Sequence, residues 1–398
     1  MAINKTKRLR QLEAVKSWSK DKFNTVLMHT GTGKTWVFFD SLLKTKCNHV
    51  LILAETTVRE ETILDDRQKY ITFFGKDPFE NRQVQFMCYH SLKNYIIPKE
   101  VKKKKLFIFC DEVHELITPS RFPYLKRLDS NKFHFLGLTA TLDKLGLFTI
   151  GEETLTKFQF LDSYAPICYE YHIEDAKVDN TTRDLIVITY EHKLDTRLNI
   201  VAGTKFKRWM SSEDKQNMYY NDSVRKSMFL PDSNPQKKFL IRNTSSARMR
   251  FLHALPSKIV ACKHLLNILP GRTIVFAYDS DTLMKLGIPA IVVENKNYKQ
   301  DLQRFINGEI NQIGTNKILL QGANLGKVDN MVNLSYDSKE GKTKQKAGRL
   351  RQDLSFGRVI IFKTLNTQEA KWYESMVQPL LVFPQKTINN ISEITKYL

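Results

Sequence analysis

The sequence predicts an α/β protein with two doubly wound parallel-sheet lobes and a mostly helical insertion in the second lobe. Three observations predict this architecture. Short runs of Val, Ile, Leu and Phe recur between longer mixed segments, which is typical of buried parallel strands joined by crossover helices. The pattern occurs twice along the 398 residues, a length that suits about two or three domains. Between residues 196 and 250 the strand pattern is missing, and basic and aromatic residues are mixed instead.

The apolar runs place the expected strands and the domain boundary. In the first lobe the runs cover residues 25–28, 49–54, 84–88, 106–110 and 133–140. In the second lobe they cover residues 184–190, 272–277, 289–294, 316–320, 331–335 and 358–362. We therefore expect a first lobe over residues 1–165 and a second over 166–398, with the helical insertion at about 196–250.

The chain is strongly basic. Its 62 Lys and Arg residues outnumber 42 Asp and Glu residues and give a formal net charge of +20 at pH 7. This excess is more than solubility requires and favours a polyanionic partner, with nucleic acid as the leading candidate. A basic surface without a specific partner is the alternative. The run KKKK at residues 102–105 could steer polyanions, but a solvated loop is the favoured interpretation.

Cysteine usage and hydropathy indicate a reduced, cytoplasmic protein. No pair among the five cysteines has the C-x-x-C spacing of a zinc or redox site. No apolar run approaches the roughly 20 residues that span a bilayer, and the start, MAINKTKRLR, lacks the hydrophobic segment of a signal peptide. We therefore expect no membrane association. The cysteines are Cys47, Cys88, Cys110, Cys168 and Cys262.

The stretch LMHTGTGKT at residues 27–35 lies where the first expected strand ends and a helix should begin. Glycines allow backbone N–H groups to close around a β-phosphate, the lysine adds a positive charge to the β and γ phosphates, and the threonine hydroxyl can bind Mg²⁺. G-x-G-K-T after an apolar strand therefore predicts an ATP site with Mg²⁺, although Met28 stands where the general pattern has a glycine. The expected phosphate-loop residues are Thr30, Gly31, Thr32, Gly33, Lys34 and Thr35.

Two adjacent carboxylates, Asp111 and Glu112, follow the apolar run FIFC. In a doubly wound sheet the carboxyl ends of neighbouring strands share one crevice, so Asp111 is expected near Thr35. Asp111 would then hold Mg²⁺, directly or through water, and Glu112 would take the proton from the attacking water. An acidic turn that faces solvent is the alternative. His114 alone is more typical of a structural histidine, and without an H-E-x-x-H pattern a zinc site has no support.

The residues DEVH at 111–114, together with the phosphate loop, resemble the D-E-x-H helicases and translocases of superfamily 2, and the resemblance covers nearly the whole chain. It implies two RecA-like lobes. Upstream, RLRQLEAV is similar to the family's adenine-reading segment and implies that Gln11 and Arg8 bind the nucleotide. Downstream, LTAT is similar to the motif that links the nucleotide state to lobe movement. The implied coupling residues are His114, Thr139 and Thr141.

Two further stretches carry the resemblance into the second lobe. LLQGANLGKVDN is similar to the family's fifth motif, whose glycine, here Gly322, and following residues face nucleic acid and nucleotide. QKAGRLRQ is similar to the sixth motif and implies that Gln345 and Arg349 act in hydrolysis, with Arg349 as an arginine finger to the γ-phosphate. The stretch ends in Gln where the family has a second arginine. Either Arg351, one residue earlier, acts as the second arginine finger from a shifted backbone position, or the second finger is absent.

The resemblance also places contacts to nucleic-acid phosphates in two loops of the first lobe, AETTVRE and YHSLK. Such contacts would come from hydroxyl groups, backbone amides and basic side chains of the protein, and they would not depend on the nucleotide sequence. The implied residues are Thr56, Arg59, Ser91 and Lys93, and ordinary loop positions are the alternative for each. In the insertion, Trp209, Tyr219 and Tyr220 could stack on bases, but packing of an accessory helical unit is the favoured interpretation.

A nucleotide site shared by two lobes implies motion, because ATP would close the cleft and hydrolysis would release it. The short chain and its ending, QKAGRLRQ to TQEAKWY, look most like phage and bacterial DNA helicases of recombination and repair. We therefore expect a monomeric DNA-dependent ATPase that translocates and unwinds or remodels branched DNA in the cytoplasm, which would be the host's for a phage protein. A protein partner could supply specificity. The alternatives are an RNA helicase, a duplex DNA translocase that feeds a partner nuclease, and a nucleic-acid clamp without hydrolysis.

Overall fold

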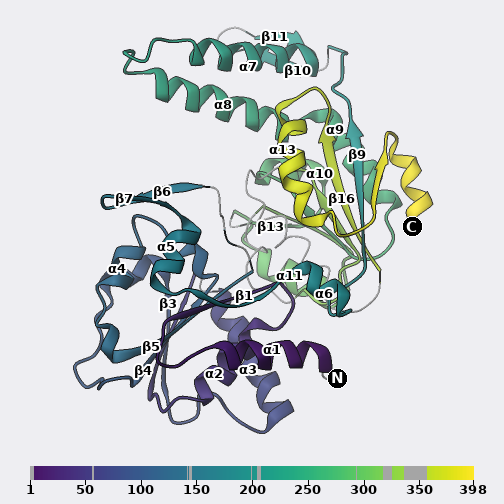
Figure 1. The fold of residues 1–398 in the computed structure, drawn as a ribbon. Coiled ribbons are helices and arrows are strands. Elements are labelled where there is room, and N and C mark those ends of the chain that lie inside the picture. The colour runs from purple at the N-terminus through teal and green to yellow at the C-terminus, as the bar shows by residue number, and fades with distance from the viewer. Residues whose placement is uncertain are drawn as a thin grey trace. The chain divides into compact units, whose positions relative to one another are not determined.

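The computed structural model describes residues 4–55, 58–140, 142, 146–198, 200–203, 208–292, 294–316, 325–335 and 356–398. The described chain divides into two compact units, unit 1 up to Arg183 and unit 2 from Asp184 onward (Figure 1). This division falls after the expected boundary at residue 165, because the segment Ile167–Tyr171 adds a strand to the first sheet. Each unit is an α/β domain with its own sheet.

Unit 1 is built on a six-stranded sheet. Its strands are β1 (Asn24–Met28), β2 (His49–Ala54), β3 (Gln83–Cys88), β4 (Leu106–Asp111), β5 (Phe133–Thr139) and β8 (Ile167–Tyr171). Their order is β3-β2-β4-β5-β1-β8, and every neighbouring pair is parallel. The carboxyl ends of β1, β4 and β5 therefore lie at one edge, where the phosphate loop, the two carboxylates and the LTAT segment follow them. A separate antiparallel hairpin consists of β6 (Leu147–Ile150) and β7 (Glu153–Thr156).

Helices pack on both faces of this sheet. They are α1 (Lys5–Ser17), α2 (Lys34–Leu43), α3 (Val58–Phe74), α4 (Phe122–Lys126), α5 (Lys157–Tyr164) and α6 (Ile173–Val178), with the shorter η1 (Tyr89–Asn94), η2 (Val113–Glu115) and η3 (Ser130–Lys132). Helix α1 begins at Asn4, whose side chain accepts a hydrogen bond from the Lys7 N–H at 3.0 Å, as an N-cap residue does. Helices α1, α2 and α3 contribute to the core on one face, and η1, α4 and α5 to the core on the other.

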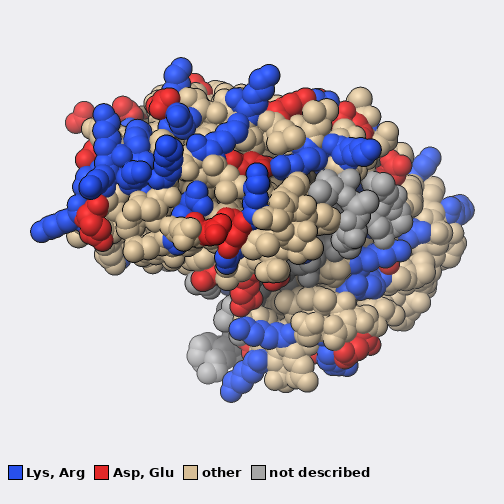
Figure 2. Space-filling view, turned by 90° about the horizontal axis from the view of Figure 1, so that it is seen from below, with Lys and Arg blue, Asp and Glu red and all other residues tan. Residues whose placement is uncertain are grey.

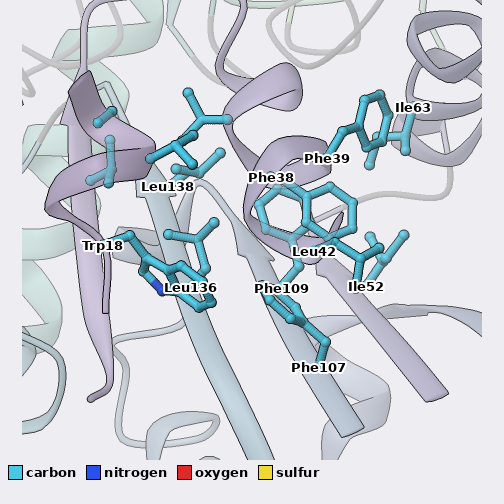
Figure 3. Close-up of a cluster of buried hydrophobic side chains, with 14 of the residues drawn as sticks. Trp18, Phe38, Phe39, Leu42, Ile52, Ile63, Phe107, Phe109, Leu136 and Leu138 are labelled. Carbon is cyan, nitrogen blue, oxygen red and sulfur yellow. The ribbon is translucent and has the colours of Figure 1, made fainter. Parts of the chain in front are cut away.

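The two cores follow from the alternation of side chains along the strands. Phe107 and Phe109 of β4 point into the core with α2, and Ile108 points into the opposite core. Figure 3 shows Phe38 of α2 over Phe109, with the ring centroids 4.0 Å apart and the planes 3° from parallel. Trp18, at the end of α1, packs 5.6 Å from the Phe107 ring. These contacts fix α1 and α2, and with them the phosphate loop, on the sheet.

Unit 2 is built on a seven-stranded parallel sheet in the order β13-β14-β12-β15-β16-β9-β17. The strands are β9 (Leu185–His192), β12 (Thr273–Phe276), β13 (Ala290–Ile291), β14 (Gln312–Thr315), β15 (Asn330–Asn333), β16 (Gly357–Thr364) and β17 (Gln385–Ile388). The helices are α7 (Glu213–Met228), α8 (Lys237–His253), α9 (Pro256–Ile268), α10 (Ser280–Leu286), α11 (Tyr298–Ile306) and α13 (Gln368–Val377), with η6 (Gln378–Leu380) and η7 (Ile391–Tyr397). Side chains of α9, α10 and η7 share a core with the sheet.

The predicted fold class is confirmed, since both large sheets are parallel and helices contribute to their cores. The strand predicted at 316–320 lies, except for Asn316, outside the described residues, whereas the preceding strand β14, which ends at Thr315, was not predicted. Its sequence QIGT is weakly apolar because α10 packs closely on it: a Cβ on Gly314 would lie 2.5 Å from Leu283 Cδ2. The edge strand β17 is mostly exposed, which explains why no apolar run indicated it.

The predicted insertion consists mostly of two helices and also contains a short antiparallel hairpin that was not predicted. Two short antiparallel strands, β10 (Ile200–Gly203) and β11 (Arg208–Ser211), precede the paired helices α7 and α8 (Figure 1). Glu213 at the start of α7 is fully buried and accepts hydrogen bonds from the Asp195 and Ser257 N–H groups, both at 2.9 Å. These bonds anchor the paired helices to the rest of unit 2. Tyr220 packs on Phe251, whereas Trp209 and Tyr219 are about half exposed.

Basic side chains gather in clusters on the face drawn in Figure 2, where they outnumber acidic ones. Within the run at 102–105, Lys104 donates to the Phe133 carbonyl at 2.8 Å, whereas Lys102 and Lys103 are exposed. The His49 N–H also donates to the Lys105 carbonyl at 3.1 Å, so the run agrees with a loop that is solvated at Lys102 and Lys103 and tied to the sheet at Lys104 and Lys105. Among the described helices, none combines the length and the apolar character needed to cross a bilayer.

Candidate active site

The phosphate-loop residues connect β1 to α2. Gly31 and Gly33 have φ angles of 98° and 76°, in the left-handed region that favours glycine. Lys34 and Thr35 follow in the first turn of α2, and both are buried. The Thr32 hydroxyl donates to the carbonyl three residues upstream at 2.8 Å and closes the turn. The loop therefore has the strand-to-helix geometry that phosphate binding requires.

Gln11 of α1 is buried against this loop. Its Nε2 donates to the Thr32 carbonyl at 2.8 Å. Arg8 donates to Gln11 Oε1 at 3.2 Å and forms a bidentate ion pair with Asp40 of α2, at 2.5 and 2.9 Å. The two residues expected at the nucleotide base thus contact one another, and Gln11 contacts the loop directly. Asp40, which holds Arg8 in place, was not indicated by any motif.

The phosphate loop and the paired carboxylates are in direct contact. Lys34 Nζ lies 3.1 Å from Glu112 Oε1. Glu112 adopts φ 53° and ψ 54°, a left-handed conformation that is unfavourable for a residue with a Cβ and that often occurs at functional sites. Burial alone would raise the pKa of Glu112, but the Lys34 ammonium, together with interactions with His114 and the Ala140 N–H, lowers it to about 2. Glu112 is therefore held as a carboxylate.

Two of the predicted coupling residues, His114 and Thr139, contact the same carboxylate. His114 Nδ1 lies 2.8 Å from Thr139 Oγ1, and the Thr139 hydroxyl donates to Glu112 Oε2 at 3.4 Å. The Ala140 N–H also donates to Glu112 Oε2, at 3.3 Å. Lys157 of α5 donates to the His114 carbonyl at 2.7 Å. The ends of β4 and β5 are thus joined through the side chain that is expected to activate water.

Arg59 occupies a place that the sequence did not indicate. It was expected to contact nucleic acid, but its Nε donates to Asp111 Oδ2 at 2.5 Å and its Nη2 donates to Thr35 Oγ1 at 3.3 Å. The guanidinium therefore bridges the two residues expected to hold Mg²⁺. Burial alone would lower the pKa of Arg59, but the Asp111 carboxylate raises it, so the group stays charged.

The same two residues have the oxygen atoms that Mg²⁺ prefers. Asp111 is buried, and its Oδ1 has no hydrogen-bond partner within the described part of the chain. Thr30 Oγ1, in the phosphate loop, is likewise buried without a partner there. These oxygens, together with Thr35 Oγ1, fit a hard divalent cation, and no described group of three or more His, Cys, Asp or Glu side chains offers another metal site.

The two loops expected to contact nucleic acid are joined by Arg121. Its Nη1 forms an ion pair with Glu55 Oε2 at 2.8 Å, and its Nη2 lies 2.7 Å from His90 Nε2. Ser91 and Lys93 follow on η1, and both are exposed. Arg121 is nearly buried, and no motif pointed to it because an isolated arginine carries no local pattern.

Several predicted residues lie outside the described part of the chain. They are Thr56, Thr141, Gly322, Gln345, Arg349 and Arg351. The arginine finger and the second-finger question therefore stay predictions. The described site consists of unit 1 side chains alone.

Comparison with known proteins gives one family match. Residues 2–144 match the family described as "Type III restriction enzyme, res subunit". The matched segment contains α1, the phosphate loop and the DEVH residues. A search of curated proteins finds no match.

Solved structures share the fold at low identity. Saccharomyces cerevisiae Dbp5 bound to RNA and ADP BeF3 is 12% identical, with a TM-score of 0.59 over 98% of this chain and 91% of that one. The ATP-dependent Type ISP restriction-modification enzyme LlaBIII bound to DNA is 12% identical, with a TM-score of 0.61 over 98% of this chain and 31% of that one. The Pyrococcus furiosus Hef helicase domain is 15% identical, with a TM-score of 0.51 over 94% and 99%.

These likenesses show a fold of two parallel-sheet domains, and the family match covers most of the domain that holds the site. Within that domain Lys34, Thr35, Asp111 and Glu112 form one connected cluster. Residues 2–144 are therefore similar to the res-subunit family, and the chain shares its fold with solved helicase and restriction-enzyme structures.

Proposed function

We propose that the protein hydrolyses ATP to move along DNA, and that it unwinds or remodels branched DNA in recombination, repair or replication. The observation that carries the proposal is the contact between Lys34 and Glu112, at 3.1 Å, beside Asp111 and Thr35. This cluster joins a phosphate-binding lysine, a candidate general base and a candidate metal site at one sheet edge.

The charges of the site support hydrolysis. The Lys34 ammonium would exchange its contact with Glu112 for the β and γ phosphates of ATP, because phosphate carries more negative charge than one carboxylate. Glu112 would then be a carboxylate released from Lys34 and oriented by Ala140 and Thr139. Thr35 and Asp111 would hold Mg²⁺, which neutralises charge on the phosphates. The predicted finger Arg349 would complete the site.

Three observations support DNA as the track. The matched family is named for a restriction-enzyme subunit, and LlaBIII, which shares the fold, is bound to DNA in its structure. The net charge of +20 favours a polyanion. Ser91 and Lys93, both exposed near the carboxyl end of β3, are available for phosphate contacts.

The other candidate functions each have some support. Dbp5, which shares the fold, is bound to RNA, so an RNA track is the first alternative. The restriction-enzyme match favours the second, a duplex DNA translocase that works with a partner nuclease. A clamp without hydrolysis is the third, and the intact contact of Lys34 with Glu112 argues against it. The proposal further includes a monomeric, cytoplasmic protein, with a partner for specificity.

The test is steady-state ATP hydrolysis by the purified protein with Mg²⁺, alone and with single-stranded DNA, duplex DNA, forked DNA, a four-way junction or single-stranded RNA. The Lys34→Ala variant is the blank. Strongest stimulation by forked or four-way DNA, with strand displacement, supports the proposal. Strongest stimulation by RNA would show that the protein acts on RNA instead of DNA. Stimulation by duplex DNA without strand displacement favours the duplex translocase. No turnover with any polymer favours the clamp without hydrolysis.

A further inference from the structure

One guanidinium holds the two residues expected to bind the metal. Arg59 is the second residue of α3, and its Nε and Nη2 reach Asp111 Oδ2 at 2.5 Å and Thr35 Oγ1 at 3.3 Å. The ends of β4 and β1 and the start of α3 are therefore connected by a single side chain. No other described lysine or arginine forms an ion pair with Asp111.

The site is electrically balanced by its own residues. The Arg59 and Asp111 side chains are 17% and 7% exposed, and a carboxylate this deeply buried requires a positive partner. The adjacent Glu112 is paired with Lys34. Each of the two neighbouring carboxylates thus has one cation of its own, supplied from a different helix.

A guanidinium and Mg²⁺ would exclude one another here. Both are cations that would bind the Asp111 carboxylate and Thr35 Oγ1, so they would repel one another, and Arg59 already contacts Asp111 Oδ2 and Thr35 Oγ1. From this arrangement we infer that Arg59 is an internal counter-cation of the metal site, which Mg²⁺ must displace when it enters with ATP. This inference rests on the proposed function, because it takes Thr35 and Asp111 as the metal-binding residues.

Displacement of Arg59 by Mg²⁺ would also affect the segment at residues 54–60. Arg59 belongs to the segment 54–60, which the resemblance assigns to nucleic-acid contact. The same segment contains Glu55, which Arg121 joins to His90. Release of Arg59 from Asp111 would free the first turn of α3, so metal binding and the conformation of this segment are coupled. Arg59 is then a positioning residue that reports the occupancy of the metal site.

The first experiment measures metal binding without nucleotide. Mn²⁺ titrations followed by electron paramagnetic resonance compare the wild type with Arg59→Gln, which removes the charge and keeps a polar side chain. We expect Arg59→Gln to bind one Mn²⁺ at least about tenfold more tightly than the wild type, since about 1.4 kcal/mol of competition gives that factor. Adding Asp111→Asn to Arg59→Gln should abolish the gained site.

Arg121→Gln is the matched control, because it also removes a mostly buried arginine that is paired with a carboxylate, Glu55. It should gain no Mn²⁺ site. Equal Mn²⁺ affinity in the wild type and Arg59→Gln would overturn the inference, as would an equal gain in Arg121→Gln. If Arg59→Gln does not fold, Arg59→Lys keeps the positive charge and should bind Mn²⁺ as weakly as the wild type. Tighter binding by Arg59→Lys would contradict the inference.

A second measurement uses the wild type alone. The Arg59 Nε–H resonance in ¹⁵N NMR, assigned with Arg59→Lys, should move when Mg²⁺ and ADP are added together, and should stay in place with ADP and a chelator. An Nε–H signal unchanged by Mg²⁺ and ADP would overturn displacement. A wild type that hydrolyses ATP while Arg59 stays in place refutes only this inference, whereas a wild type without ATP binding refutes the proposed function.

Discussion

Lys34 Nζ lies 3.1 Å from Glu112 Oε1, so the cation expected to bind phosphate is held by the carboxylate expected to activate water. The contact holds both side chains in place, and the Lys34 ammonium keeps the Glu112 carboxylate charged by lowering its pKa. Binding of ATP would separate the two side chains, so that Lys34 contacts the phosphates and Glu112 becomes available to activate water. The contact therefore links nucleotide binding to the availability of the base.

Glu112→Gln should separate ATP binding from hydrolysis. The amide keeps the size of the side chain but accepts no proton, so we expect ATP to bind while the turnover rate falls by at least about 100-fold. A fluorescent ATP analogue measures binding, and phosphate release measures turnover. Glu80→Gln changes an exposed carboxylate of the same unit and should leave both unchanged. A Glu112→Gln variant that cannot bind ATP would indicate a structural role instead.

The depressed pKa of Glu112 should appear in the pH dependence of stability. Its pKa in the folded chain is about 2, below the ordinary 4.5, so folding favours the charged form. The stabilisation is complete above about pH 4.5 and is lost as the pH falls toward about 2. The melting temperature of the wild type should therefore fall relative to that of Glu112→Gln in this window. If the difference in melting temperature between the wild type and Glu112→Gln stays constant from about pH 5 to about pH 2, the depressed pKa of Glu112 is contradicted.

The sequence predicted the fold and the cluster around Lys34 because both depend on local patterns. Buried parallel strands are continuous apolar runs, and a phosphate loop needs small residues and a lysine at fixed spacing. Asp111 near Thr35 followed from the shared edge of a doubly wound sheet, and Arg59 bridges the two in the structure.

Other features had no local signal. The bridge made by Arg59 joins residues 24 and 52 positions away, and long side chains choose partners only after the strands are assembled. The link from Glu55 through Arg121 to His90 likewise joins residues that are far apart in the sequence. Strands β14 and β17 were not predicted because neither is a continuous apolar run. In β14 the residue that packs against α10 is a glycine, Gly314, and β17 lies at an exposed edge of the sheet.

Gly33 of the phosphate loop should be sensitive to substitution. It has φ 76°, and a Cβ would lie 2.5 Å from Gln11 Nε2. We expect Gly33→Ala to displace Gln11 and weaken ATP binding by at least about tenfold. Gly75→Ala is the control, because Gly75 also has a positive φ, 63°, but a Cβ added there would meet no side chain within 4 Å. Each change should cost about 1–2 kcal/mol in backbone strain, and only Gly33→Ala should affect ATP. Equal ATP affinity in the two variants would reject a close fit of Gln11 on the loop.

Nucleic-acid binding should depend steeply on salt. If phosphate contacts dominate, affinity for single-stranded DNA should fall at least about tenfold between about 50 and 200 mM salt. Lys93→Ala should lower the salt slope by about one counterion, since Lys93 is exposed after the carboxyl end of β3. Lys76, exposed before the amino end of β3, gives the control Lys76→Ala with an unchanged slope. A flat titration of the wild type would refute the electrostatic argument.

Unit 2 depends on a buried ion pair between α9 and α13. Lys258 Nζ lies 2.8 and 2.7 Å from the two carboxylate oxygens of Glu369, and both side chains are almost completely buried. Burial alone would raise the pKa of Glu369, but Lys258 lowers it, so the pair is ionic. Glu369→Ala leaves a buried ammonium without its partner and should destabilise the unit by about 3–5 kcal/mol.

The pair between Lys363 and Glu191 supplies the contrast to this buried pair. Its atoms are 3.3 Å apart, but its side chains are 23% and 26% exposed, so Glu191→Ala should cost about 1 kcal/mol or less. Thermal and urea unfolding compare the two variants. Replacing Lys258 and Glu369 together by Met and Leu should recover most of the loss, because a matched apolar pair needs no counter-charge. If Glu369→Ala melts at the same temperature as Glu191→Ala, the buried pair does not stabilise unit 2, and the positions of α9 and α13 must depend on apolar packing alone.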